Sequence, residues 1–242
     1  MGLYDGSNNL LTKTGGGTLS ASMTAATPAT ITVEAQTNAT SVTLKVSDAA
    51  GNVAMATQSV VLGTTGDDTA LGGTANADFI YGFGGADTIT GGAGADTLAL
   101  GAADSAVDTV TYTASGETDN RTTGFFADGG STSAMDVITE AAIGDKLKVW
   151  AGVLAGATTV STSYLTDATT NKVAIVQGAL DGSGNFTAGA GGSNDDYIVQ
   201  WADGTAVHSV VLKDYGTTAP TLTADETAGT LTITAPDTTP PR

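Results

Sequence analysis

Four aspartates recur at nearly regular intervals in a glycine-rich stretch of this chain. They are spaced by ten, nine and nine residues, at Asp68, Asp78, Asp87 and Asp96. Each follows a glycine-rich run and precedes, two positions later, an apolar residue: Ala70, Ile80, Ile89 and Leu98. Glycine permits tight turns in which carbonyl oxygens converge, and aspartate adds a hard anionic oxygen. Because Ca²⁺ takes about six to eight such oxygens, this spacing predicts calcium binding.

The elements that position these aspartates follow from the pattern G-G-x-G-x-D-x-U-x, which is typical of a calcium-binding parallel β-roll. Each repeat forms a turn and a short strand, and successive turns lie on alternating sides. A cation therefore sits between one turn and the next but one. One predicted site joins 63–68 to 82–87, and the other joins 72–78 to 91–96. A flexible polar linker is the alternative, which four repeats in nearly unbroken register disfavour.

The predicted metal contacts come from side chains and backbone carbonyls of all four turns. They are Gly63, Thr65, Asp67, Asp68, Gly72, Thr74, Asn76, Asp78, Gly82, Gly84, Ala86, Asp87, Gly91, Ala93, Ala95 and Asp96.

The composition favours an all-β protein that binds cations. Aromatic residues make up 5% of the 242 residues and glycine contributes 33, which disfavours a large conventional core. Short β-prone runs indicate strands. The 25 acidic and 8 basic residues give a net charge of −17, which argues against nucleic acid and anionic membranes as partners. Repulsion among the carboxylates loosens the metal-free chain, and each bound divalent ion relieves it.

The chain lacks cysteines, a recognisable signal peptide and long apolar runs. It has no cysteine, so outside the cell bound metal is the obvious substitute for disulfides. Residues 1–11 do not read as a signal peptide, and no apolar run has membrane-spanning length. We therefore expect a protein that does not span a membrane.

Catalysis is not expected. The only histidine, His208, lies on a predicted strand, where a packed or surface position is usual. The chain contains neither H-E-x-x-H nor G-x-S-x-G, and it has no phosphate-binding loop or dinucleotide fingerprint. The sequence predicts that the protein is not an enzyme.

Beyond the repeats, 108–113 and 135–139 read as strands that continue and cap the roll, because the end of a solenoid must be covered. Large apolar residues assigned to this cap are Phe125, Phe126, Trp150 and Trp201. Four further aspartates lie in turn-like contexts, where one or two could ligate another calcium and the others are solvated: Asp104, Asp108, Asp128 and Asp136.

Two later acidic clusters have different interpretations. Asp181 begins an EF-hand-like spacing but lacks the required Gly and Glu, which favours a plain glycine turn. Asp196 occupies the ligand position of a single degenerate nonapeptide, where it could hold a cation.

The repeats resemble the RTX (repeat-in-toxin) calcium-binding repeats of proteins exported by type I secretion in Gram-negative bacteria. MDVITEAAIGDKLKVW at 135–150 is similar to the segment after the roll in serralysin-type C-terminal domains and RTX surface-layer proteins. Residues 195–216 resemble their closing strands. The resemblance covers 63–216 and departs at Ala141 and Lys148, where the pattern has Phe and Asp, and one residue is missing between Gly144 and Asp145. It implies export and an extracellular or bacterial cell-surface location.

Both ends of the chain resemble the bacterial immunoglobulin-like domains of tandem adhesins. The N-terminal stretch carries LYDG, DAAGN and strand-like runs at 30–35, 41–46 and 53–62. These make four or five strands, fewer than the roughly seven of such a sandwich. The C-terminal stretch has an alternating run at 230–234 and a DTTPP linker. Its strands either complete a sandwich in a neighbouring molecule by head-to-tail strand exchange, pack on their own chain, or are disordered; alternatively, the chain is a piece of a longer array.

The expected architecture is all-β, with an incomplete immunoglobulin-like β-sandwich, a short parallel β-roll and a β-rich cap. The expected domains are 1–62 for the sandwich segment, 63–101 for the roll, 102–216 for the cap and 217–242 for the last strands and linker.

The expected function is that of a calcium-binding extracellular structural protein, S-layer-like or filament-forming, which folds on calcium after secretion and self-associates. One alternative is a ligand- or glycan-binding module of a large RTX adhesin, using an exposed calcium and an aromatic such as Tyr197 or Trp201. Another is the non-catalytic secretion domain of an exported enzyme.

Overall fold

The protein is all-β apart from one 3₁₀ turn, η1 (Ser115–Glu117), in the part of the chain that the structure describes. This confirms the predicted all-β class. The computed structural model describes residues 2–5, 40–47, 53–101, 105–121, 130–131, 134–150, 152–157, 160–169, 172–181, 183–189, 195–216 and 218–234. Phe125, Phe126, Asp104, Asp128 and the expected strand at 30–35 lie outside these residues.

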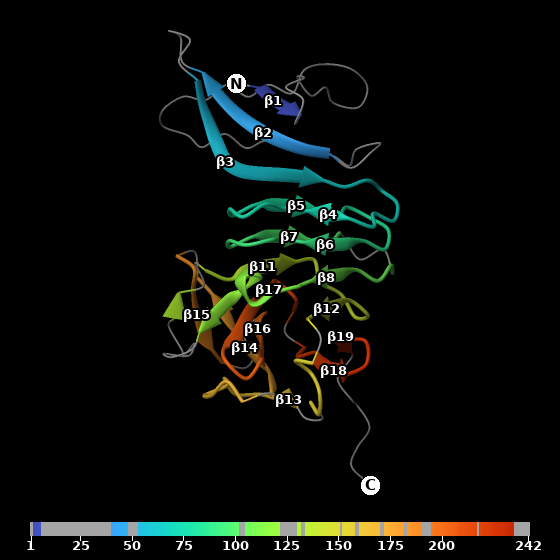
Figure 1. Cartoon of the computed structure of the whole chain (residues 1–242), viewed down its shortest axis with the longest axis vertical. Coiled ribbons are helices and arrows are strands. Elements are labelled where there is room, and N and C mark those ends of the chain that lie inside the picture. Colours follow the sequence, from blue (N-terminus) through green and yellow to red (C-terminus); the bar gives the residue numbers. More distant parts are fainter. Residues whose placement is uncertain are drawn as a thin grey trace.

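Two stacks of short parallel strands form the roll at the centre of the molecule (Figure 1). The first stack contains, in order, β3 (Val53–Leu62), β5 (Phe79–Tyr81), β7 (Thr97–Ala99) and β11 (Asp136–Thr139). The second contains β4 (Leu71–Gly72), β6 (Thr88–Thr90), β8 (Thr109–Thr111) and β12 (Lys146–Lys148). The chain alternates between the stacks, and the stacked strands continue past residue 101 to β12.

One apolar side chain from the middle of most strands fills the space between the stacks. Ile80, Ile89, Leu98, Val110 and Ile138 are each 0% exposed, because alternate residues of a strand face opposite sides. Each buried side chain of this size contributes roughly 1.5–3 kcal/mol. The inward positions predicted for Ile80, Ile89 and Leu98 are confirmed.

The inward position predicted for Ala70 is wrong. Ala70 is exposed, whereas Leu71 is 1% exposed and pairs with Ile89 of the neighbouring strand. The repeat between Asp68 and Asp78 has ten residues instead of nine, and the extra residue lies before the buried position.

The N-terminal strands continue the first stack of the roll. β1 (Gly2–Asp5) pairs antiparallel with β2 (Thr40–Ser47), β2 pairs antiparallel with β3, and β3 pairs in parallel with β5. The strands expected at 41–46 and 53–62 are confirmed by β2 and β3. The immunoglobulin-like sandwich stays a prediction, since most of residues 1–39 lie outside the described part.

The cap is an antiparallel sheet that joins the roll edge to edge. Its central strands are β14 (Val173–Leu180), β16 (Asp196–Ala202) and β17 (Val207–Lys213), and β17 pairs in parallel with β11. Shorter strands flank them: β9 (Asp119–Arg121), β10 (Gly130–Ser131), β13 (Val160–Ser161) and β15 (Asn185–Ala188). Trp201, 0% exposed, and the half-buried Trp150 pack in the core shared by roll and cap, as predicted.

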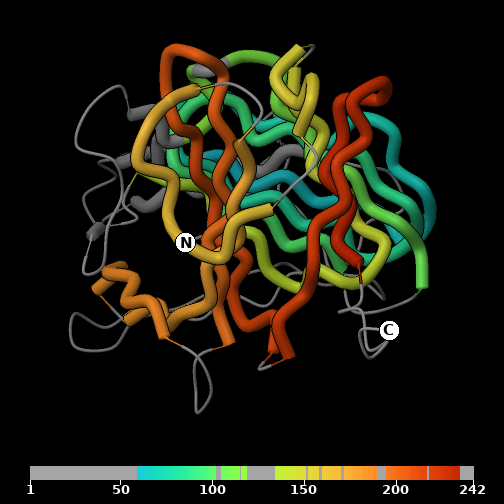
Figure 2. Tube along the Cα trace, turned by 90° about the horizontal axis from the view of Figure 1, so that it is seen from below, coloured from blue at the N-terminus to red at the C-terminus, as the bar shows by residue number. Residues whose placement is uncertain are grey.

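The last two strands pack on their own chain. β18 (Thr221–Asp225) and β19 (Thr230–Thr234) form a hairpin, and β19 pairs antiparallel with β12. Viewed along the stack, this red hairpin lies against the roll, apart from the orange cap strands (Figure 2). Leu222, Leu231 and Ile233 are buried in the common core. Strand exchange would remove these side chains from it, so the structure favours the alternative of packing within the chain.

Candidate calcium sites in the turns of the roll

Each turn of the roll lies against the next turn but one, as the sequence predicts. The amide of Gly63 donates to the carbonyl of Tyr81 at 2.7 Å, and the amide of Gly82 donates to that of Ala99 at 2.8 Å. The equivalent bond on the other side runs from the amide of Gly73 to the carbonyl of Thr90, at 2.9 Å. The second turn therefore opens at Gly73. The predicted opening residue, Gly72, belongs to β4 and is exposed, because the extra residue of this repeat precedes the turn.

The predicted aspartates connect each turn to the next but one. The amide of Asp68 donates to Oδ1 of Asp87 at 2.9 Å, and the amide of Asp78 donates to Oδ1 of Asp96 at 2.8 Å. Asp78, Asp87 and Asp96 are each 1% exposed. The structure thus brings together the two pairs of turns that the sequence assigned to two calcium ions, and it places their carboxylates inside the roll.

Each series of bonds from the amide of one aspartate to the carboxylate of another forms what we call an aspartate ladder, and both ladders continue beyond the four repeats. On one side, the amide of Asp87 donates to Oδ1 of Asp108 at 2.8 Å, and the amide of Asp108 to Oδ1 of Asp145 at 2.9 Å. On the other side, the amide of Asp96 donates to Oδ1 of Asp136 at 2.9 Å. Sequence reasoning flagged Asp108 and Asp136 but not Asp145.

A shared signal could have identified all three additional aspartates. In each, a buried apolar residue follows two positions later, as in the repeats: Val110 at 0%, Ile138 at 0% and Leu147 at 2% exposure. The longer and irregular insertions between these aspartates hide their common register.

Close contacts explain why the stacked turns need glycine. A Cβ atom at Gly73 would lie 2.1 Å from the carbonyl oxygen of Gly91, and one at Gly92 would lie 1.9 Å from that of Thr74. Gly92 and Gly94 also have φ angles of +98° and +122°, which L side chains rarely adopt. The turns therefore hold carbonyl oxygens against the neighbouring turn, where they can contribute hard ligands.

We call the turns at 63–68 and 73–78 the outer turns, and those at 82–87 and 91–96 the inner turns. The second carboxylate oxygen of Asp96, in an inner turn, differs from those of the two outer turns. Oδ2 of Asp68 accepts the amide of Thr64 at 2.7 Å, and Oδ2 of Asp78 accepts the amide of Thr74. In contrast, Oδ2 of Asp96 is buried and has no hydrogen-bond partner, and burial raises the pKa of this carboxyl to about 6. A buried, unsatisfied anionic oxygen is costly. Carboxylate, carbonyls and net negative charge together fit Ca²⁺.

The other predicted contact residues lie at the surface of the turns. They are exposed or half-buried, and each can offer a backbone carbonyl: Thr65, Thr74, Asn76, Gly84, Ala86, Ala93 and Ala95. Asp67 is exposed and its Oδ1 accepts the amide of Ala86 at 2.8 Å, which connects the same two turns from outside. The metal-binding role of each individual residue stays a prediction.

Two other acidic clusters are satisfied by backbone amides. Oδ1 of Asp181 accepts the amides of Ser183 and Asn185 at 2.8 and 2.9 Å, which agrees with the predicted simple turn. Asp196 is 4% exposed, and its two oxygens accept the amides of Asp214 and Leu180 at 2.7 and 2.6 Å. The carboxylates of Asp195, Asp196 and Asp214 have oxygens within 4.8 Å of one another.

His208 is packed inside the cap, one of the two positions expected for it. It is 0% exposed, with Nδ1 2.9 Å from Oγ1 of Thr118 and Nε2 3.0 Å from Oδ2 of Asp203. Burial raises the pKa of Asp203, but hydrogen bonds from Thr205, Ala206 and His208 outweigh it and hold the pKa below its ordinary value.

The aromatics suggested for glycan contact are in the wrong place. Tyr197 and Trp201 are 1% and 0% exposed, because both belong to β16, whose two faces are covered. Neither side chain can present a surface to a sugar.

Comparison with known proteins identifies the repeat segment. Residues 62–98 match the family described as RTX calcium-binding nonapeptide repeat, in four copies. No curated protein sequence matches the chain. In the part of the chain that the structure describes, no helix has the length and apolarity needed to cross a membrane. The chain thus carries RTX-type repeats, and its cofactor is Ca²⁺.

Proposed function

We propose that this chain is an extracellular structural protein that folds when Ca²⁺ fills the turns of its roll. The observation that carries the proposal is the pair of buried aspartate ladders. The ladders place carboxylates on both sides of one narrow core, from Asp68 to Asp145 and from Asp78 to Asp136.

The charges of the described residues support calcium-dependent folding. Ion pairs join Lys172 to Asp167, His208 to Asp203 and Lys213 to Asp214 in the cap, whereas Asp96 and Asp136 of the second ladder are buried carboxylates, 1% and 0% exposed. Bringing like charges into a medium of low dielectric costs free energy that a divalent cation removes. The free energy of calcium binding then becomes free energy of folding.

The calcium concentration on each side of the cell envelope determines where the chain folds. Sites of extracellular modules have dissociation constants of roughly 10⁻⁴–10⁻³ M. Such sites stay empty where calcium is scarce and fill outside the cell. In this proposal the chain stays loose before export, becomes rigid at the cell surface and has an S-layer-like or filament-forming role there.

A calcium titration of the full chain tests the proposal. Circular dichroism and size-exclusion chromatography are recorded on one sample with added CaCl₂ and then with chelator, and MgCl₂ at equal concentration is the control, because Mg²⁺ demands stricter geometry. We expect reversible gain of β structure with calcium only. Large assemblies appearing together with folding support the lattice-forming role, a folded monomer contradicts it, and a signal indifferent to calcium contradicts the whole proposal.

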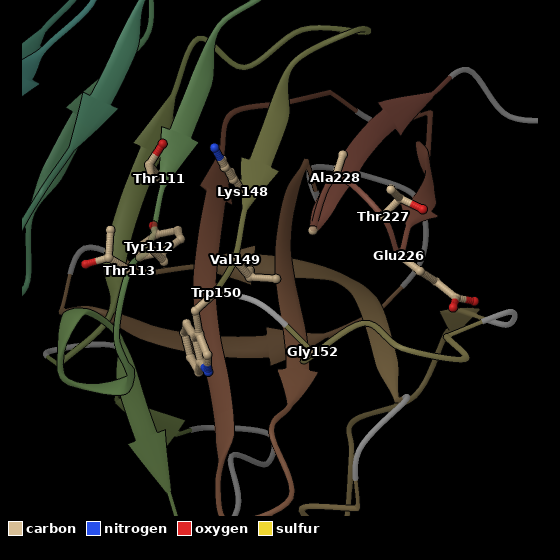
Figure 3. A pocket seen from close by; sticks show the side chains of 11 residues that line it. Thr111, Tyr112, Thr113, Lys148, Val149, Trp150, Gly152, Glu226, Thr227 and Ala228 are labelled. Atoms are coloured by element: carbon tan, nitrogen blue, oxygen red, sulfur yellow. The ribbon is translucent and has the colours of Figure 1, made fainter.

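A second candidate function, glycan binding, is favoured by a pocket of about 360 Å³ beside the roll. Its walls come from the ends of β8 and β12 and from the β18–β19 turn (Figure 3). The half-buried Trp150 lines it, together with Lys148, Glu226 and Thr227, which are exposed. The lining thus includes one aromatic ring, charged groups and a hydroxyl, which are side chains of the kinds that contact sugars.

A glycan array probed with the calcium-loaded chain tests this candidate. We expect Trp150→Leu to weaken binding by at least about tenfold, a loss of about 1.4 kcal/mol. Tyr81→Leu, which changes a half-buried aromatic outside the pocket, is the matched control. Absence of glycan binding, or equal binding by Trp150→Leu, contradicts it.

A further inference from the structure

The second aspartate ladder reaches the junction between roll and cap. Oδ1 of Asp78 accepts the amide of Ser59 at 2.8 Å, Oδ1 of Asp96 that of Asp78 at 2.8 Å, and Oδ1 of Asp136 that of Asp96 at 2.9 Å. The first two steps span 19 and 18 residues, whereas the last spans 40. Asp136 thus repeats the geometry of the recognised turns although it lies outside residues 62–98.

The carboxylates at this junction lack the partners that satisfy other ends of the ladders. Asp96 and Asp136 are 1% and 0% exposed, and Oδ2 of Asp96 has no hydrogen-bond partner. At the end of the other ladder, Oδ2 of Asp145 accepts the amide of Ala142 at 2.7 Å. Two neighbouring buried carboxylates without a basic residue are stable only when protonated or bound to a cation.

Asp136 lies beside Tyr112, a residue of the core that roll and cap share. Tyr112 is 1% exposed, and its ring centroid lies 5.5 Å from that of Trp201 in the cap.

We propose that Asp96 and Asp136 hold an additional Ca²⁺ that joins the cap to the roll. The inference rests on the proposed function, because it extends calcium binding from the four repeats to the cap. Asp136 is the first residue of β11, which pairs with β7 of the roll through Ile138–Leu98 and with β17 of the cap through Ile138–Leu212. A cation here orders the strand on which both sheets depend.

Counting the ions bound by the calcium-saturated full chain tests the proposal. Asp136→Asn keeps an Oδ1 acceptor for the Asp96 amide but removes the charge. We expect this variant to bind one Ca²⁺ fewer per chain than wild type in equilibrium dialysis. Asp181→Asn is the matched control, with an unchanged count, because Asp181 is exposed and its carboxylate accepts amides in a simple turn outside both ladders.

The outcomes separate this inference from the proposed function. If wild type binds no calcium, the proposed function fails. If wild type binds calcium and Asp136→Asn binds the same number of ions, only the additional site is overturned; the same holds if Asp181→Asn alone loses an ion.

A luminescent probe covers the case in which Asp136→Asn does not fold. Tb³⁺ replaces Ca²⁺ and emits when a nearby tyrosine or tryptophan is excited, and Tyr112 contacts Asp136. In the full chain, Tyr112→Phe is expected to bind the same number of Tb³⁺ ions with less than half of the sensitised emission. Undiminished emission from Tyr112→Phe overturns the site.

Discussion

The outer and inner turns of the roll close in different ways. In the outer turns, the second oxygens of Asp68 and Asp78 accept amides of their own turns, from Thr64 and Thr74. The inner turns change chain direction through residues with positive φ angles. Phe83 and Gly85 have φ angles of +73° and +98°, and Gly92 and Gly94 have +98° and +122°. The outer turns are therefore closed by side-chain hydrogen bonds, whereas the inner turns contain residues with positive φ angles, and Oδ2 of Asp96 is left without a hydrogen-bond partner.

The largest effect is expected from filling an inner turn. Gly92→Ala places a Cβ atom 1.9 Å from the Thr74 carbonyl at a positive φ, and we expect a loss of about 3 kcal/mol or more. Gly72→Ala is the control, because nothing lies within 4 Å of that Cβ position, and its effect stays within about 0.5 kcal/mol. Urea unfolding at saturating calcium measures both. Equal losses would remove the distinction between the two glycines.

Removing a buried inner carboxylate should come next in size. We expect Asp87→Ala to raise the calcium midpoint of folding about tenfold or more, because a charged ligand and the acceptor for the Asp68 amide disappear together. The exposed Glu226→Ala, outside the roll, serves as control, with a change of less than about threefold. An unchanged midpoint for Asp87→Ala would contradict its assignment to a calcium site.

Acidification should separate the metal-free from the calcium-loaded protein. The pKa values of Asp96 and Asp136 rise from 3.8 to about 6 and about 7 in the fold, so the folded state binds protons more tightly than the unfolded state. Metal-free stability is therefore greatest at low pH and is lost as pH rises through about 6 to 7. In chelator, we expect circular dichroism to show more remaining β structure at pH 5 than at pH 8.

With calcium the sign reverses, because protons compete with the metal for the same carboxylates. The calcium midpoint should be higher at pH 5 than at pH 8. Asp96→Asn reduces both pH effects if the inner turns are responsible, while Asp68→Asn, in an outer turn, leaves them. If Asp68→Asn reduced the pH effects and Asp96→Asn left them unchanged, the outer turns and not the inner turns would be responsible.

The smallest effect is expected from the side chain that supports an outer turn. Oγ1 of Thr74 donates to Oδ2 of Asp78 at 2.8 Å in a partly exposed setting. Thr74→Val should cost about 1 kcal/mol of unfolding free energy without changing the number of bound calcium ions. Loss of an ion in calcium counting would show that the outer turn, too, depends on this hydroxyl for its metal.

The repeats were predictable from sequence because their chemistry is local. The interval between aspartates, with an apolar residue two positions later, determines both the turn and the buried side chain, as at Ile80, Ile89 and Leu98. One extra residue was enough to misplace Ala70 and Gly72, since nothing in the sequence says where a ten-residue repeat accommodates it. Leu71 decides this by its pairing with Ile89.

Long-range pairing was much harder to predict. Asp136 and Asp145 accept the amides of Asp96 and Asp108 across 40 and 37 residues, and their register depends on insertions that carry no periodic signal. The same holds for Tyr197 and Trp201: an aromatic on an alternating strand suggests one exposed face, but β16 lies between β14 and β17 and is covered on both faces. The antiparallel pairing of β19 with one stack of the roll likewise depends on a strand, β12, far away in the chain.

The aspartate ladder has a polarity along the chain. In every described step the amide belongs to the earlier residue and the carboxylate to the later one, from Ser59 and Asp78 through to Asp108 and Asp145. Each turn is therefore buttressed by a side chain that is contributed further toward the C-terminus. Removing strands from the N-terminal side therefore removes amide donors but leaves the carboxylates of the later turns in place. Removing the segment with Asp136 and Asp145 instead removes the acceptors for the amides of Asp96 and Asp108.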